Sequence, residues 1–237
     1  MTYEYSLALD RTDGTTKVMP VEFRRVISSK SIRITPDLAR QSVKVTYPFY
    51  VPRARAIDFL ESKKEWVAAK LLKAPERRRI ADGTAIDLFG RRLRIAHIPG
   101  ARRGVWSEGE HLFVSGGAEF LHRRVMDHVK SEALKYFGAA TRAYGAKLGV
   151  KVGRIRVKDT VSRWGSCSAN GDMSFSWRLA FAPLYVAEYI AAHEVAHRIE
   201  MNHGIKFWRL LRRAYDGNID AAAKWLARNG AKLWGWE

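Results

Sequence analysis

The stretch LYVAEYIAAHEVAH, residues 184–197, decides the fold of this chain of 237 residues. Its apolar residues recur at helical spacing on more than one side, which predicts an α-helix that is buried on most of its faces. Pro183 stands directly before it, at a position where a missing N–H costs a helix nothing. We therefore expect a helix from Pro183 to about Met201, ended by the Asn-His-Gly run at 202–204.

Within this helix, His193, Glu194 and His197 form an H-E-x-x-H motif. Residues four apart share a helix face, so the two imidazoles project side by side, about 6 Å apart along the axis. That separation lets both rings bind one zinc ion from the same side. Glu194 lies roughly 100° around the helix from His193, where a general base can take a proton from metal-bound water.

Burial of the motif supports the metal hypothesis. A carboxylate and two imidazoles are costly to bury unless each finds a charge or a hydrogen-bond partner, and one divalent cation would serve all three. The alternative is three independently satisfied polar residues that form the pattern by accident.

A catalytic zinc ion generally takes three protein ligands and leaves a fourth position open. His203 is our candidate for the third ligand, because a turn after the helix end can swing it back over the metal. Glu200 is the alternative, since it shares a helix face with the two motif histidines. It lies about 10.5 Å along the axis from His193, however, so we expect it to orient an imidazole instead.

The sequence around the motif helix predicts an α+β arrangement. Strand patterns occur at 5–9, 18–25, 31–34 and 42–47, with Asp13-Gly14 as a hairpin signal, and again at 85–95, 105–114, 152–157 and 173–179. Helical patterns occur at 54–72, 119–148, 205–215 and 219–233. We expect a β-rich N-terminal region with one helix over residues 1–118, and a helical and β core that carries the motif over residues 119–237.

Composition excludes several classes of protein. A single Cys rules out an intramolecular disulfide framework and any Cys₄ or Cys₂His₂ zinc site. That residue, Cys167, is better interpreted as a small buried hydrophobe than as a thiol nucleophile. No window reaches the roughly 18 uncharged apolar residues of a membrane span, and the N-terminus lacks a basic region followed by an apolar run. We therefore expect a cytoplasmic protein that does not enter a membrane.

The net charge invites a second interpretation. Lys and Arg number 42 against 24 Asp and Glu, which gives a formal charge of +18, and such surfaces attract phosphate. The cations are spread along the whole chain, with no long basic arm to collect them. A solvated surface is the simpler interpretation, and non-specific binding of nucleic acid is the alternative.

Several segments together resemble a known family. They are the SRWGSC run at 162–167, Trp177-Arg178-Leu179, Ala182-Pro183, Tyr189, the HEVAH motif, Asn202-His203-Gly204 and Phe207-Trp208. They are similar to segments of the YgjP-like metal-dependent hydrolases, which resemble in turn the SprT-like and WLM metallopeptidases. The resemblance implies a zincin-type core, with zinc ligands at His193, His197 and His203 and the catalytic acid/base at Glu194. Glu200 stands where metzincins have a Gly, which argues against that branch.

The predicted function is therefore a zinc-dependent hydrolase, namely a metallopeptidase that cleaves peptide bonds of a peptide or protein substrate. One Zn²⁺ per chain is expected, with another divalent ion as the alternative. Arg163 and Tyr189 are candidate donors to the developing oxyanion, unless Arg163 pairs with an acid and Tyr189 caps the core. The strand at 173–177 either pairs with an extended peptide or lies covered in the core. Two other functions stay open: a basic protein that recruits the metal site to DNA-bound protein, and a non-catalytic metal-binding scaffold.

Overall fold

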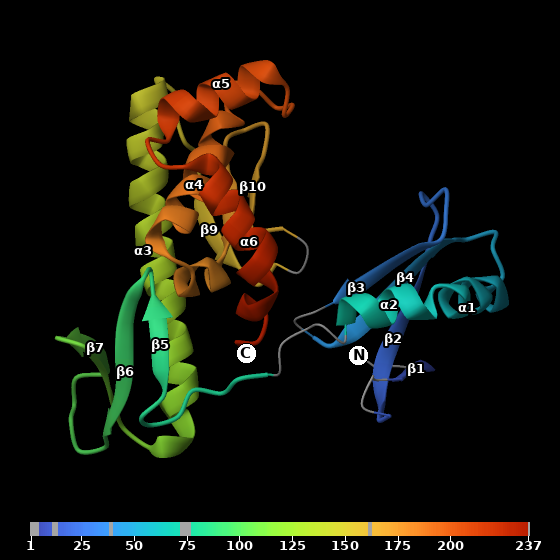
Figure 1. Ribbon diagram of the computed structural model, residues 1–237, viewed down its shortest axis with the longest axis horizontal. Helices are drawn as coiled ribbons and strands as arrows, with labels where there is room; N and C mark the ends of the chain where they lie inside the picture. The colour runs from blue at the N-terminus through green and yellow to red at the C-terminus, as the bar shows by residue number, and fades with distance from the viewer. Residues whose placement is uncertain (1–4, 11–13, 38–39, 72–76, 161–162, 237) are drawn as a thin grey trace. The chain divides into compact units, whose positions relative to one another are not determined.

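The computed structural model describes residues 5–10, 14–37, 40–71, 77–160 and 163–236. Three positions of the expected elements, Asp13, Leu72 and Ser162, lie outside these described residues. The chain forms two compact units, residues 1–77 and residues 78–236 (Figure 1). Sheets dominate the N-terminal part and helices the C-terminal part, so the predicted α+β fold class is confirmed.

The first unit is a four-stranded sheet with two helices packed on it. The strand order is β1-β2-β4-β3, with β1 (Tyr5–Asp10), β2 (Thr16–Val26), β3 (Arg33–Asp37) and β4 (Ser42–Pro48). Alternate residues of the strands, such as Met19, Val21 and Val45, are buried against Leu60 and Val67 of the helices α1 (Arg53–Ser62) and α2 (Lys64–Leu71). The four predicted strands are confirmed, whereas the one predicted helix is two helices that meet at Lys63.

The second unit begins with another four-stranded sheet, in the order β5-β6-β8-β7. Its strands are β5 (Ala85–Leu88), β6 (Arg91–Ile98), β7 (Val105–Glu108) and β8 (His111–Ser115). Each of the strand patterns predicted at 85–95 and 105–114 is thus a pair of strands. One face of the sheet, with Ile86, Leu93, Ile95, Leu112 and Val114, is buried in the same core as the long helix α3 (Leu121–Leu148). In Figure 1 this sheet lies beside the lower half of α3.

That packing explains why the chain divides between residues 77 and 78 rather than near residue 118. The apolar face of the β5–β8 sheet needs α3 to cover it, and α3 lies on the far side of the expected boundary. Residues 78–118 therefore belong to the unit that carries the motif.

A three-stranded sheet packs on the same helix. Its order is β10-β11-β9, with β9 (Ile155–Lys158), β10 (Gly165–Cys167) and β11 (Met173–Ser176). The central strand is β11, so the expectation that it offers an edge to a peptide is wrong, and the alternative of a core strand holds. Phe175 of β11 is fully buried, and its ring stacks on Phe137 of α3 with 4.2 Å between centroids. The edge strands are β10 and β9, and β10 is the one that leads from Arg163.

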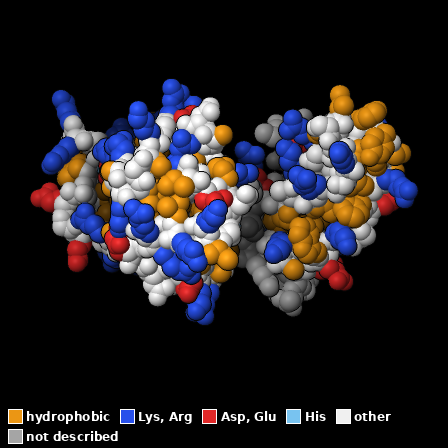
Figure 2. Space-filling view, turned by 90° about the horizontal axis from the view of Figure 1, so that it is seen from above, with side chains coloured by type: hydrophobic (Ala, Val, Ile, Leu, Met, Phe, Trp, Pro, Cys, Tyr) orange, Lys and Arg blue, Asp and Glu red, His pale blue; other side chains and the backbone are white. Residues whose placement is uncertain are grey.

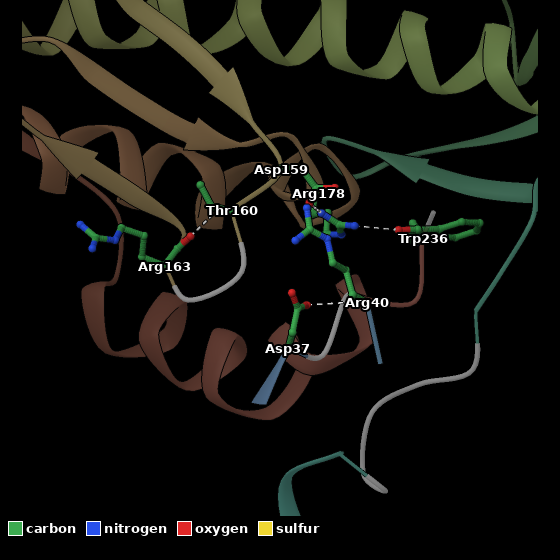
Figure 3. A network of polar contacts seen from close by, with 7 residues as sticks. All are labelled: Asp37, Arg40, Asp159, Thr160, Arg163, Arg178 and Trp236. Carbon is green, nitrogen blue, oxygen red and sulfur yellow. Dashed lines mark hydrogen bonds and ion pairs between the residues drawn. The ribbon is translucent and has the colours of Figure 1, made fainter. Parts of the chain in front are cut away.

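A buried arginine ties the end of the chain to this core. Arg178 lies in the short 3₁₀ helix η2 (Trp177–Phe181) and is only 3% exposed. Its guanidinium forms an ion pair with Asp159 and donates to the Trp236 carbonyl over 3.2 Å (Figure 3). It also lies over the rings of Trp177 and Trp234.

Three helices complete the second unit: α4 (Leu184–Ala196), α5 (Ile205–Ala214) and α6 (Ile219–Leu233). Pro183 is the N-cap of α4, and the helix is buried on most sides, as predicted. It ends several residues before Met201, because the amides of Arg198 and Ile199 bond only three residues back, to the carbonyls of Val195 and Ala196. No described helix is long and apolar enough to span a membrane.

Candidate metal centre

Three imidazoles converge at the C-terminal end of α4. His193 lies in the last turn of the helix, His197 is its C-cap, and His203 comes from the loop that leads to α5. One ligand atom from each ring lies within 4.8 Å of the other two. The Nε2 atoms of His193 and His203 are 2.9 Å apart. The structure therefore brings together the three histidines that the sequence proposed as metal ligands.

Hydrogen bonds to backbone carbonyls position the His197 ring and the loop that carries His203. The Nδ1 atom of His197 lies 3.0 Å from the backbone carbonyl of Glu200, so an N–H there leaves the Nε2 lone pair free for a cation. The Trp208 indole donates to the carbonyl of His203 over 3.1 Å, which ties the loop to α5. Glu200 thus orients an imidazole as expected, but through its backbone and not through its carboxylate.

Phe207 of α5 forms an apolar floor under the cluster. It is fully buried, and its ring centroid lies 4.9 Å from that of His193, 4.7 Å from that of His197 and 4.6 Å from that of His203. This floor depends on the way α5 packs against α4. An apolar floor keeps water from one side of the imidazoles and favours their neutral form.

The donor set fits a divalent cation. Burial, together with the neighbouring His197 and His203, lowers the pKa of His193 to about 4. Burial also lowers the pKa of His197. The rings of His193 and His197 are therefore neutral near pH 7, which is the form that binds metal. The Nδ1 atom of His193 is buried, and among the described residues it has no hydrogen-bond partner.

Glu194 lies beside the histidines as a buried carboxyl group, only 5% exposed. Burial raises its pKa to about 7, and the positive charge of Arg163 opposes that rise. Its side chain rests against Gly165 of β10, where a Cβ atom would meet the Glu194 Cγ at 2.7 Å. Sequence reasoning missed this contact, since nothing local in the SRWGSC run shows that its glycine faces the motif helix.

The structure also places the other candidates. Arg163 is exposed, just before β10, and its side chain extends away from Arg178 in Figure 3. Tyr189 is 7% exposed, and its ring meets that of His193 edge-on with 5.8 Å between centroids. Cys167 is half-buried in β10. Burial raises the pKa of its thiol, and the negative charge of Glu194 raises it to a smaller extent. A protonated thiol is a poor nucleophile, which agrees with the prediction for Cys167.

One protein family matches most of this chain in sequence. The sequence model of the family described as "YgjP-like, metallopeptidase domain" matches residues 30–229. The crystal structure of the metallopeptidase zymogen of Pyrococcus abyssi abylysin is similar over 41% of this chain and 94% of its own, with 20% identity and a TM-score of 0.35. Among curated proteins none matches the sequence.

Proposed function

This chain belongs to the YgjP-like metallopeptidase family, and from that premise we propose that it is a zinc-dependent peptidase that hydrolyses peptide bonds. One observation carries the proposal: three imidazoles converge beside a buried carboxyl group at the end of one helix. A scaffold that only binds metal would not need that fourth group.

His193, His197 and His203 would hold the zinc ion. Imidazole suits zinc, and three histidines leave the fourth position that catalytic sites keep open. When bound, the zinc ion supplies a Lewis acid that lowers the pKa of water and polarises the scissile carbonyl.

Glu194 would move the proton. Its carboxylate takes a proton from the attacking water and then delivers that proton to the leaving amine. A pKa near 7 suits both steps, because the group accepts and returns a proton at neutral pH. We keep Arg163 and Tyr189 as candidate donors to the oxyanion, since Arg163 acts electrostatically on Glu194 and Tyr189 contacts His193.

The free edge of β10 is the proposed guide for the substrate. We propose β10 for this role in place of β11, because β11 lies between two strands and has no edge to offer. An edge strand offers unpaired N–H and C=O groups to an extended peptide, and Gly165 sets this edge directly against Glu194. We place the reaction in the cytoplasm, where a chain with one cysteine needs no disulfide.

The test is cleavage of an unfolded protein such as reduced casein by the purified chain. We expect cleavage that stops after treatment with a chelator and returns on addition of one equivalent of zinc. Cobalt and manganese, added in place of zinc, distinguish the metals by the activity that each restores. Stoichiometric zinc without cleavage of casein or of a mixed peptide library would favour the scaffold.

A further inference from the structure

The outer face of the β5–β8 sheet carries a row of aromatic and basic side chains. Residues paired across the strands share a face, and the pairs Arg94–His111, Ala96–Phe113 and Trp106–Phe113 lie opposite the buried side that packs on α3. Along this described stretch, the buried residues Leu93, Ile95 and Leu112 alternate with them. The face is therefore open within the second unit.

Three rings on this face form a stack. Trp106 of β7 stacks on Phe113 of β8 across the strands, with 5.3 Å between centroids and 22° between planes. His111 stacks on Phe113 along β8, at 5.6 Å and 26°. The guanidinium of Arg103 lies 5.3 Å from the Trp106 ring centroid. The row thus runs from a cation through three near-parallel rings, and His111 at one end is exposed.

Basic residues flank the stack on the neighbouring strand. Arg92 and Arg94 of β6 are both exposed and lie on the same face as the rings. Arg92 is held near Asp87 at 3.3 Å, whereas Arg94 is the direct neighbour of His111 in the register. Lys and Arg side chains also gather on another face of the molecule, which Figure 2 shows from above. The sheet face also carries two carboxylates, those of Asp87 and of Glu108, which lies opposite His111 in the register. Arg92, Arg94 and Arg103 outnumber them, so a polyanion would still meet a favourable field here.

We propose that this sheet face binds single-stranded nucleic acid. Aromatic side chains on a sheet stack on exposed bases of any sequence, and arginines beside them contact the backbone phosphates. A duplex hides its base faces, so it cannot use the rings. A neutral polysaccharide could use the rings but gains nothing from the arginines. The proposal stands on the sheet alone and is independent of the peptidase activity.

The experiment measures fluorescence anisotropy of a labelled oligothymidylate of about 15 nucleotides, a length that one such site can hold. The unlabelled competitors are the matching duplex, polyglutamate and a neutral glucan. We expect the single strand to bind best and its affinity to fall as salt rises from about 50 to 200 mM. Trp106→Ala and Phe113→Ala should each weaken binding about tenfold or more. The first removes one ring of the stack, and the second removes the ring on which Trp106 and His111 both stack.

Three further variants separate stacking from misfolding and from general charge. Phe113→Tyr keeps a ring and should bind like the wild type. Trp66→Ala removes an aromatic side chain of the first unit that is 45% exposed, and it should also leave binding unchanged. Arg94→Gln should reduce the slope of log K against log salt by about 0.7, which corresponds to one phosphate contact on a single strand. Thermal melting confirms that each variant is folded.

Binding that survives both Trp106→Ala and Phe113→Ala in folded protein would overturn the proposal. Equal competition by polyglutamate or by the duplex would overturn it too, because general attraction to polyanions would then explain the affinity. Preferential binding of the glucan, or no binding of the oligonucleotide at the lower salt concentration, would have the same consequence.

Discussion

Gly165 of β10 touches the side chain of Glu194 on α4 so closely that a Cβ atom at residue 165 would stand 2.7 Å from the glutamate Cγ and 2.8 Å from its Cδ. The carboxyl oxygen Oε1 would lie closer still, and Glu194 is buried, so an added Cβ atom has to displace the carboxyl group. The edge strand therefore sets the position of the carboxyl group.

Gly165→Ala should displace the Glu194 carboxyl group and leave the three histidines in place. A misplacement of about 1 Å at a reacting group costs on the order of a hundredfold in rate, so we expect a loss of that size in kcat/KM with unchanged metal content. Gly100→Ala is the control, because nothing lies within 4 Å of the added Cβ. Equal activity of the two variants would show that the contact does not position the carboxyl group.

His203→Ala should remove the third ligand, and Glu200→Ala should not. The side chain of His203 belongs to the cluster, whereas Glu200 reaches His197 through a backbone carbonyl that alanine keeps. Elemental analysis of protein purified without chelator should show stoichiometric metal in Glu200→Ala and at least tenfold weaker binding in His203→Ala. His128→Ala, on α3, serves as the histidine control. Metal loss in Glu200→Ala alone would reverse the assignment.

Cys167 should react slowly with iodoacetamide at neutral pH. Burial and the charge of Glu194 raise the thiol pKa above the ordinary 9.0, and a raised pKa leaves less thiolate at every pH below it. The alkylation rate, followed by mass spectrometry, should still be rising at pH 9 and should stay several-fold below that of free cysteine at pH 8. A rate that levels off below pH 8 would contradict this environment.

Arg178→Met should destabilise the second unit. The change removes an ion pair with Asp159, a hydrogen bond to the Trp236 carbonyl and the contacts with two tryptophan rings. We expect the free energy of unfolding in urea, followed by tryptophan fluorescence, to fall by about 2–3 kcal/mol. Asp159→Asn should cost about 1 kcal/mol or less, because the Asp159 side chain is 62% exposed. Equal losses in the two variants would assign the stability to the ion pair alone.

Local sequence patterns predicted much of the fold. The buried helix α4 and the pairing of His193 with His197 follow from helical geometry within a few residues, and the structure agrees with both. The strand segments of both units also alternate as their sequences indicate. Periodicity suffices where an element and its buried face are decided by neighbours in the chain.

Contacts between distant segments could not be predicted in this way. Spacing alone left both His203 and Glu200 as candidates, and the turn that ends α4 at Ala196 decided which side chain reaches the cluster. The position of Gly165 against Glu194 and the packing of the β5–β8 sheet on α3 depend on tertiary structure. For the same reason, the sequence could not show that β11 is a central strand and that β10 lies at an edge of the sheet.

The central claim is that Glu194 transfers the proton while the three histidines hold the metal. Metal content and casein cleavage, measured on the same preparation of Glu194→Gln, test it most directly. The account predicts full metal content with cleavage reduced on the order of 10² to 10⁴-fold. Glu188→Gln, a half-buried carboxyl on the same helix, should keep both. Full cleavage by metal-loaded Glu194→Gln would contradict the account.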